Sequence, residues 1–233
     1  MSGFDRIFND IFNLFFPNKC VYCGNNLTNI ETEICINCLN KLPKTNFIDD
    51  IQNPVFQKFW GRVNIEFAVS MYYFVKHSMV QYLFHQIKYK GRKELAKRLG
   101  QEFGLQLNTS NIFKKCDALV PVPLHPKKQK KRGYNQSEWI AKGISDILSI
   151  PVETGLIQRH VNSTSQTRKN RKERWENVRT AFSLYPNISA KYTHILLIDD
   201  VVTTGATLES CSSLLINKLG VKVSIASLAY ATD

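Results

Sequence analysis

Two adjacent carboxylates follow an apolar segment that has the composition of a buried strand. Residues Ile195 to Ile198 are apolar and rich in β-branched side chains, which is typical of a strand covered on both faces of a parallel sheet. Asp199 and Asp200 come next, so we expect the strand to end at them, at the edge where open α/β sheets hold their ligands. Carboxylates there can accept hydrogen bonds from ligand hydroxyls.

A short, hydroxyl-rich turn separates these acids from an apolar segment with helical character. Its residues are Thr203, Thr204, Gly205, Ala206 and Thr207. The glycine permits close backbone approach, and backbone N–H groups, hydroxyls and the positive end of a helix dipole would converge on one anion. The simpler alternative is a β-α turn capped by threonines, since Asp and Thr are ordinary turn and N-cap residues.

The strand, the acid pair and the turn together resemble the phosphoribosyl pyrophosphate (PRPP) motif of type I phosphoribosyltransferases. The resemblance implies that Asp199 and Asp200 bind the ribose 2′- and 3′-hydroxyls and act in catalysis, and that the turn binds the 5′-phosphate. It also implies Mg²⁺ as the cofactor that accompanies PRPP. The PRPP-binding residues would be Asp199, Asp200, Val201, Val202, Thr203, Thr204, Gly205, Ala206 and Thr207.

Four cysteines near the start of the chain form two C-x-x-C pairs with eleven residues between them. The pairs are Cys20 with Cys23 and Cys35 with Cys38. This spacing predicts a structural Zn²⁺ held by four thiolates in a small zinc ribbon, which needs the metal to fold. Two disulfides and a redox C-x-x-C are the alternatives.

The composition predicts a partner that carries negative charge. The formal net charge is +12, and residues 114–174 hold fourteen Lys and Arg against five Asp and Glu. A multiply phosphorylated sugar and a nucleic acid backbone both satisfy this pattern. We expect a cytoplasmic protein without a membrane span, because no apolar run reaches the roughly 20 residues that cross a bilayer and no signal peptide is evident.

A basic loop follows the predicted buried strand 117–123, at the position where type I phosphoribosyltransferases hold pyrophosphate. Cations and backbone amides in such a loop would stabilise the charge that grows on departing pyrophosphate. The candidate contacts are Pro123, Leu124, His125, Arg132, Tyr134, Asn135 and Gln136. The alternative is a solvated, lysine-rich loop, since Lys127, Lys128, Lys130 and Lys131 exceed what one pyrophosphate can use.

A second basic segment, residues 159–179, has hardly any apolar periodicity and lies between two predicted strands. It resembles the flap that closes over PRPP and excludes water. Its candidate contacts are Gln166, Arg168, Arg174 and Asn177.

The order of elements predicts an α/β protein: a type I phosphoribosyltransferase-like parallel sheet flanked by helices, with a small N-terminal zinc ribbon. We expect residues 1–45 to hold an amphipathic helix and the ribbon, 46–115 a linker and a hood-like segment, and 116–233 the core. The helix of residues 4–16 is expected to pack on the protein rather than on a membrane, because its polar face is poor in cations. Strands are expected at 67–75, 151–156, 181–184 and 221–229, and helices at 78–88, 94–106, 137–148 and 206–218.

Taken together, these motifs resemble the ComF family over nearly the whole chain. The resemblance rests on the cysteine pairs, Val-Pro-Val-Pro-Leu-His at 120–125, Arg-Gly-Tyr-Asn-Gln at 132–136 and Arg-x-x-Asn-Val at 174–178. It implies a zinc-binding amino-terminal part, a phosphoribosyltransferase-like domain and a role in DNA uptake during natural competence. One departure is the run Lys127 to Lys131, where the family usually has arginines and lysine gives up bidentate phosphate geometry.

Two functions are compatible with these features. The first is an enzyme that transfers the phosphoribosyl group of PRPP, with Mg²⁺, to an acceptor that the sequence does not name. The second is a non-catalytic protein that binds PRPP, a nucleotide or single-stranded DNA, alongside other DNA-uptake proteins; exposed basic and aromatic residues would suit that surface.

Overall fold

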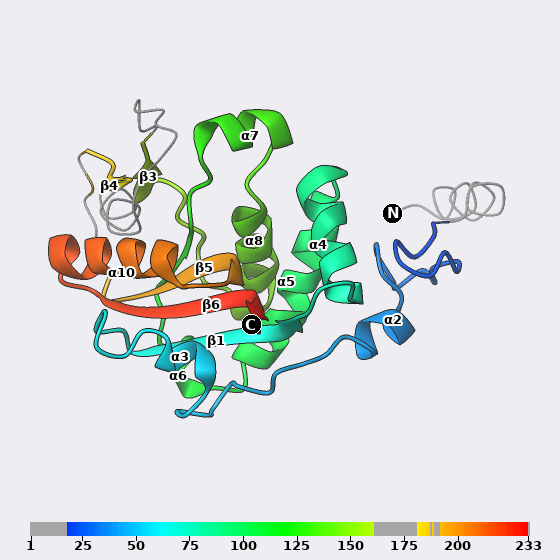
Figure 1. Ribbon diagram of the computed structural model, residues 1–233, viewed down its shortest axis with the longest axis horizontal. Coiled ribbons are helices and arrows are strands. Elements are labelled where there is room, and N and C mark those ends of the chain that lie inside the picture. Colours follow the sequence, from blue (N-terminus) through cyan, green and yellow to red (C-terminus); the bar gives the residue numbers. More distant parts are fainter. Residues whose placement is uncertain (1–17, 161–180, 187, 189–191, 233) are drawn as a thin grey trace.

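The structure, a computed structural model, describes residues 18–160, 181–186, 188 and 192–232. The strands are β1 (Phe67–Phe74), β2 (Ala118–Pro121), β3 (Ile157–Arg159), β4 (Phe182–Leu184), β5 (His194–Val202) and β6 (Lys222–Ala231). The helices are α2 (Ile36–Asn40), α3 (Pro54–Gln57), α4 (Met79–Tyr89), α5 (Lys93–Leu107), α6 (Asn111–Lys114), α7 (Pro126–Arg132), α8 (Gln136–Leu148) and α10 (Ala206–Leu219). Figure 1 shows their arrangement.

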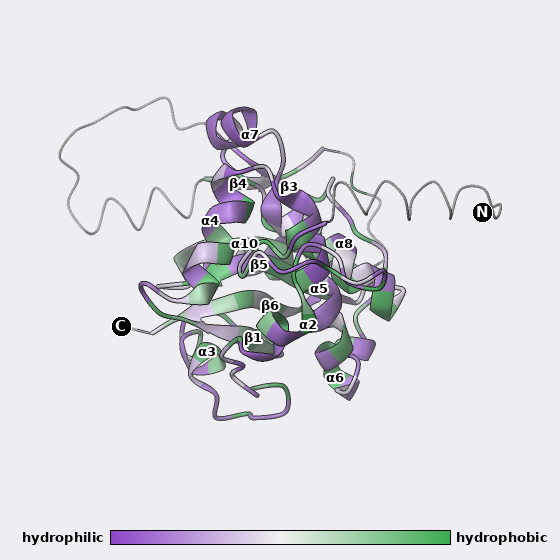
Figure 2. Cartoon of the chain, turned by 90° about the vertical axis from the view of Figure 1, so that its right-hand side faces the viewer, coloured by the Kyte–Doolittle hydropathy of each residue, from purple (hydrophilic) through white to green (hydrophobic). Residues whose placement is uncertain are grey.

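A four-stranded parallel sheet in the order β1-β6-β5-β2 forms the centre of the protein. Its middle strands are apolar along most of their length, and residues 195–198 of β5 are fully buried. Strands covered on both faces need such runs, because neither face meets water. Figure 2 shows hydrophobic residues concentrated on these strands and hydrophilic residues on α7. The expected fold class, a parallel sheet flanked by helices beside a four-cysteine unit, is confirmed.

Helices α5 and α8 pack closely against one another beside the sheet (Figure 1). Two glycines make this contact possible. A Cβ atom at Gly143 would lie 2.0 Å from the carbonyl oxygen of Lys97, and one at Gly100 would lie 2.3 Å from that of Ile140. No larger side chain fits there without moving backbone. This packing fixes α8, whose first turn reaches the candidate site.

The segment before residue 116 contributes to the sheet as well as linking parts of the chain. β1 forms one edge strand beside β6, and Phe67 and Tyr72 are almost fully buried. The predictions of a strand at 67–75 and helices at 78–88 and 94–106 are confirmed by β1, α4 and α5. Ser78 caps α4 by accepting a hydrogen bond from the N–H of Gln81.

Two predictions about local structure are wrong. Residues 151–156 form no strand; Val152 makes only an isolated bridge to Leu119, and the strand that pairs with β4 is β3. The basic loop contains a helix, α7, because Pro126 starts it, His125 caps it and Gly133 ends it in the left-handed conformation at φ +82°.

Within the described ranges, no helix is long and apolar enough to cross a bilayer. The amphipathic helix predicted at residues 4–16 lies outside those ranges.

Candidate functional site

The acid pair lies near the carboxyl end of β5, which continues two residues further than expected, to Val202. Asp200 is buried, and Asp199 is mostly buried with a small part of its surface exposed. The Oδ1 atom of Asp199 accepts hydrogen bonds from the hydroxyl of Ser137, at 3.1 Å, and from the N–H of Asp200, at 2.8 Å. The first turn of α8 therefore meets the end of β5 at the acids.

A lysine on α4 completes the surroundings of the acids. Lys88 Nζ lies 2.7 Å from Asp200 Oδ2, although the geometry is not that of a hydrogen bond. Burial, together with the charge of Asp200, raises the pKa of Asp199 to about 7, while Lys88 and Ser137 act in the opposite direction. Asp199 is thus harder to ionise than an isolated carboxylate, because it shares a buried site with a second acid.

The predicted phosphate turn connects β5 to α10. Thr203 and Thr204 are exposed, and Gly205 occupies the N-cap position in the left-handed conformation at φ +78°. Gly205 brings no side chain to cap the helix, so the N–H groups of the first turn of this 14-residue helix face the turn together with the positive end of its dipole. This arrangement suits an anion.

Two residues that the sequence did not single out support this turn from behind. Arg62 donates a hydrogen bond to the carbonyl oxygen of Thr204, at 3.0 Å, and forms an ion pair with Glu209 in the first turn of α10. The ring of Phe59 is fully buried, and its Cε1 atom would lie 3.1 Å from a Cβ atom at Gly205. Both residues come from the segment after α3, within the range 46–115 that was expected to hold a linker and a hood-like segment.

The candidate pyrophosphate residues surround α7 between β2 and α8. Pro123 and Leu124 lead into the helix, and the Nδ1 atom of His125 accepts the N–H of Lys127 at 3.2 Å. Arg132 donates to the side-chain oxygen of Gln136. The structure thus places this loop beside the first turn of α8, which carries Ser137 to the acid pair.

Two other residues of the loop hold it in place. Asn135 donates to the carbonyl oxygen of Val122, at 3.0 Å, and caps α8. The hydroxyl of Tyr134 donates to the carbonyl oxygen of Ile87, which joins the loop to the last turn of α4. The flap candidates Gln166, Arg168, Arg174 and Asn177 lie outside the described residues.

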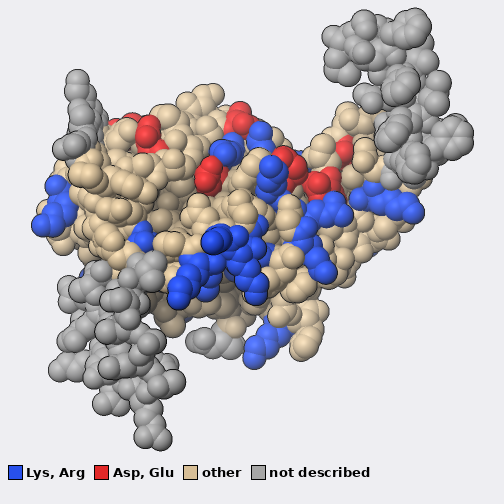
Figure 3. Space-filling view, turned by 90° about the horizontal axis from the view of Figure 1, so that it is seen from above, with Lys and Arg blue, Asp and Glu red and all other residues tan. Residues whose placement is uncertain are grey.

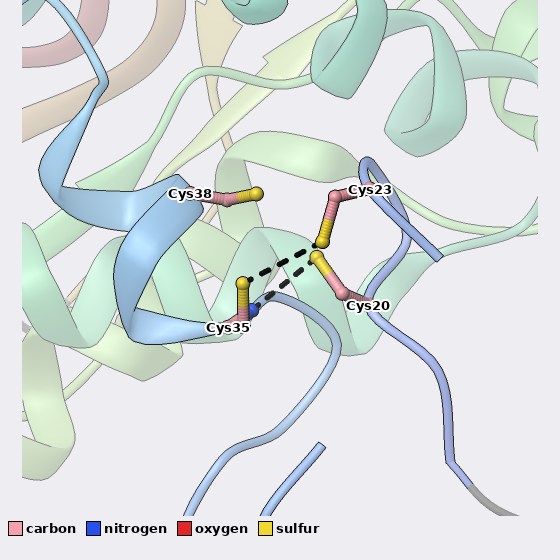
Figure 4. A group of neighbouring side chains, drawn as sticks. All are labelled: Cys20, Cys23, Cys35 and Cys38. Carbon is pink, nitrogen blue, oxygen red and sulfur yellow. Dashed lines mark hydrogen bonds between the residues drawn. The ribbon is translucent and has the colours of Figure 1, made fainter. Parts of the chain in front are cut away.

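The four paired cysteines converge on one point (Figure 4). Their sulfur atoms all lie within 4.8 Å of one another. The Sγ atoms of Cys23 and Cys35 are 3.8 Å apart, close to the spacing of about 3.8 Å that bonds of about 2.3 Å to a tetrahedral Zn²⁺ would produce. A disulfide needs about 2.05 Å, so the disulfide alternative does not fit.

The surroundings of the sulfurs also suit a metal. Three of the four cysteines are buried, and the backbone N–H of Cys35 points at the Sγ atom of Cys20, at 3.4 Å. Although burial opposes the thiolate, N–H groups of Cys23, Cys35 and Tyr22 outweigh it and lower the pKa of Cys20 to about 6. Burial raises the pKa values of Cys35 and Cys38, so these two thiols ionise less readily than Cys20 unless a cation binds beside them. Deprotonated thiolates are the form that binds metal, so this cluster could hold an ion such as zinc.

No model of a protein family matches the chain. It is 26% identical over 217 residues to Competence protein F of Haemophilus influenzae, a match that covers 89% of this chain and 94% of that protein. The expected resemblance to the ComF family is confirmed.

Other relatives match over a shorter span. Competence protein ComFC of Bacillus subtilis is 29% identical, covering 61% of this chain and 55% of that protein. The DNA utilization protein YhgH of Escherichia coli K12 is 28% identical, covering 58% and 60%. These two matches span less than two thirds of the relatives. A solved structure of "the allosteric regulatory enzyme of purine biosynthesis" matches at 20% identity and a TM-score of 0.35, covering 60% of this chain and 25% of that one.

Proposed function

We propose that the protein binds PRPP together with Mg²⁺ and serves as a phosphoribosyltransferase-like protein in DNA uptake during natural competence. The observation that carries the proposal is the junction of β5 and α10. There an acid pair and a helix N-terminus, separated by a hydroxyl-rich turn, lie side by side at the carboxyl edge of a parallel sheet. Sugar hydroxyls and a phosphate on one ligand would satisfy both parts.

In this proposal the residues divide the ligand between them. N–H groups and hydroxyls of residues 203–207 hold the 5′-phosphate. Val201 and Val202, the last residues of β5, separate this turn from the acids and so fix the distance between the two parts of the site. Asp199 and Asp200 accept hydrogen bonds from the ribose hydroxyls, and Ser137 fixes the orientation of Asp199. The loop 123–136 adjoins the diphosphate, where its N–H groups and Arg132 offset charge.

The acid pair also fits a role next to Mg²⁺, whose preferred ligands are oxygens. The Oδ2 atom of Asp200 has a charged neighbour in Lys88 but no hydrogen-bond donor of good geometry among the described residues. When bound with PRPP, Mg²⁺ would neutralise the diphosphate and assist its departure. The chain's own contribution is to position the sugar and exclude water around it.

We propose a structural Zn²⁺ for the four-cysteine cluster. The segment from Cys20 to Cys38 contains one short helix, α2, and few buried apolar residues, so a metal would supply much of the free energy that holds it folded. The similarity to Competence protein F and Competence protein ComFC supports a role in competence. In that role, the partners of the protein would be other DNA-uptake proteins.

The alternative, a non-catalytic protein that binds PRPP, a nucleotide or single-stranded DNA, is favoured by one observation. Helix α7 has five consecutive or near-consecutive cations and no buried residue. Figure 3 shows Lys and Arg side chains gathered on the face seen from above, where α7 lies. Such a surface attracts a phosphate backbone, with a steep dependence on salt. Charge reversal at Lys127, Lys128, Lys130 and Lys131 would then abolish DNA binding.

A comparison of two small ligands tests the proposed roles. Ribose 5-phosphate carries a 2′-hydroxyl equivalent that 2-deoxyribose 5-phosphate lacks, so the wild type should bind the former about tenfold more tightly. The variant Asp199→Asn/Asp200→Asn should lose this preference while keeping its circular dichroism spectrum and zinc content. Equal affinities for both sugars in the wild type would sink the assignment of the acids.

A further inference from the structure

A basic pocket lies between the C-terminal end of α4 and α7, next to the acid pair. Its volume is about 320 Å³, and it is lined by Lys88, Tyr89, Gly91, Lys128, Lys131 and Arg132. Four of these six residues are cations and none is acidic. The two walls are tied together, because the hydroxyl of Tyr134 donates to the carbonyl oxygen of Ile87 on α4.

The charge of the pocket is not balanced by protein acids. Lys88 forms the ion pair with Asp200, whereas Lys128, Lys131 and Arg132 form no ion pair with an acid in the part of the chain that the structure describes. Three such cations on one wall repel each other, and a bound polyanion would relieve that repulsion. The pocket therefore suits phosphate groups.

The size of the pocket and its aromatic wall point to a larger ligand than phosphate alone. A volume of about 320 Å³ lies at the lower end of small-molecule sites. The side chain of Tyr89 is 65% exposed, a high value for so large an apolar surface, and the guanidinium of Arg132 lies 6.0 Å from the centre of its ring. A tyrosine ring and a guanidinium both stack on a planar base.

The pocket is continuous with the candidate phosphoribosyl site through one side chain. Lys88 lines the pocket while its ammonium lies 2.7 Å from Asp200 Oδ2. A ligand in the pocket would thus lie beside the sugar that the acids are proposed to hold. One pyrophosphate cannot use all the lysines of α7, and Lys128 and Lys131 are placed to bind the phosphate of this second ligand.

We propose that this pocket binds a nucleoside phosphate as the second ligand of the phosphoribosyl site, with its phosphate on Lys128 and Lys131 and its base against Tyr89. The inference rests on the proposed function for the identity of the neighbouring site, but the pocket itself can be tested without PRPP. The small volume favours a free nucleotide over an extended strand.

The probe is 2′-deoxythymidine 3′,5′-bisphosphate, which carries a base and two phosphates but no ribose 2′-hydroxyl. Calorimetric titration compares the wild type with Lys128→Gln/Lys131→Gln, which changes the pocket, and with Lys127→Gln/Lys130→Gln, which removes the same charge from the same helix outside the pocket lining. The pocket pair should weaken binding about tenfold or more, and the control pair less than about threefold.

A second pair of variants tests the base. Tyr89→Leu should weaken binding of the nucleotide but not of inorganic tripolyphosphate, whereas Tyr82→Leu, on the same helix and also exposed, should change neither. The inference is overturned if the wild type does not bind the nucleotide, if both lysine pairs weaken it equally, or if a ten-residue thymidine strand binds while the nucleotide does not.

The acid variant separates the two proposals. Asp199→Asn/Asp200→Asn should lose PRPP and keep the nucleotide. Loss of nucleotide binding in this variant, with the pocket variant unaffected, would place the nucleotide at the acids and overturn the pocket. Unchanged PRPP binding in the acid variant, with nucleotide binding lost in the pocket variant, would instead overturn the proposed function and leave the pocket standing.

Discussion

The ammonium of Lys88 lies 2.7 Å from the Oδ2 atom of Asp200, so a side chain from the last turn of α4 reaches the acid pair at the end of β5. The two residues are far apart in the sequence, and only the docking of α4 beside the sheet brings them together. Without a ligand, this cation offsets part of the repulsion between Asp199 and Asp200. Lys88 therefore reduces the net negative charge of the acid pair to which the sugar is proposed to bind.

Replacement of Lys88 should shift the pH dependence of PRPP binding. Burial and Asp200 hold the pKa of Asp199 at about 7, and Lys88 lowers it, so Lys88→Met raises that pKa further. If the sugar hydroxyls need the carboxylate form, binding strengthens as pH rises through this pKa. The midpoint for the variant should then lie about half a unit to one unit higher than that of the wild type.

The matched control for this change is Lys90→Met, because Lys90 lies just beyond α4 and outside the lining of the basic pocket. Its pH profile should follow that of the wild type. A profile for Lys88→Met that moves to lower pH, or does not move, contradicts this account of the acid pair.

Gly205→Ala should damage the phosphate turn more than it damages the fold. Alanine is strained at φ +78°, and its Cβ atom would press on the buried ring of Phe59. We expect a loss of about 1–2 kcal/mol in the free energy of unfolding and at least tenfold weaker PRPP binding. Chemical denaturation and calorimetry measure the two effects.

Gly220→Ala is the comparison, since Gly220 ends the same helix at φ +67° and a Cβ atom there would meet nothing within 4 Å. It should lose about 1 kcal/mol of stability and keep its affinity for PRPP. Equal losses of affinity in the two variants would mean that the effect at Gly205 is one of global stability.

Arg62 should act as a positioning residue for the same turn. Arg62→Gln removes the ion pair with Glu209 and weakens the hold on the carbonyl oxygen of Thr204, so the turn loses its support while its own atoms stay unchanged. We expect PRPP affinity to fall about threefold to tenfold. Arg98→Gln, which breaks an ion pair with Glu102 on α5, should leave affinity unchanged; a similar fall there would remove the special role of Arg62.

The cysteine cluster should bind one zinc ion per chain. Cys35→Ser leaves three thiolates, and we expect it to lower zinc content after dialysis and to reduce the melting temperature, because metal binding stabilises this small unit. Cys116→Ala removes a buried thiol outside the cluster and should retain full zinc content. Atomic emission spectroscopy measures the zinc content of both variants, and thermal denaturation measures the melting temperature. An unchanged metal content in Cys35→Ser would contradict the assignment.

Elements with a strong local pattern could be predicted from the sequence. The apolar run before Asp199 predicted the strand β5. The glycine after two threonines predicted the turn into α10, and the C-x-x-C pairs predicted the sulfur cluster. Helix α7 was missed, although Pro126 and Gly133 mark its two ends, because a segment of five cations and one glutamine lacks the apolar periodicity by which helices are recognised.

Contacts between segments that lie far apart in the sequence could not be predicted, because no local pattern of residues marks them. Arg62 meets Thr204 across 142 residues, and nothing in the composition of residues 58–65 distinguishes it from a solvent-facing arginine. Lys88 lies at the end of the predicted helix 78–88, and nothing in that sequence connects it to Asp200. Tyr134 and Asn135 were expected to bind ligand, but their described hydrogen bonds go to backbone groups, a use that depends on which elements happen to be adjacent.

Calorimetric titration of PRPP, with and without Mg²⁺, tests the central claim most directly when the wild type is compared with Asp199→Asn/Asp200→Asn. The account predicts binding to the wild type that strengthens with Mg²⁺ and disappears in the variant, whose zinc content and circular dichroism spectrum stay the same. PRPP binding of equal strength in both proteins would show that the acid pair at the end of β5 does not hold the sugar.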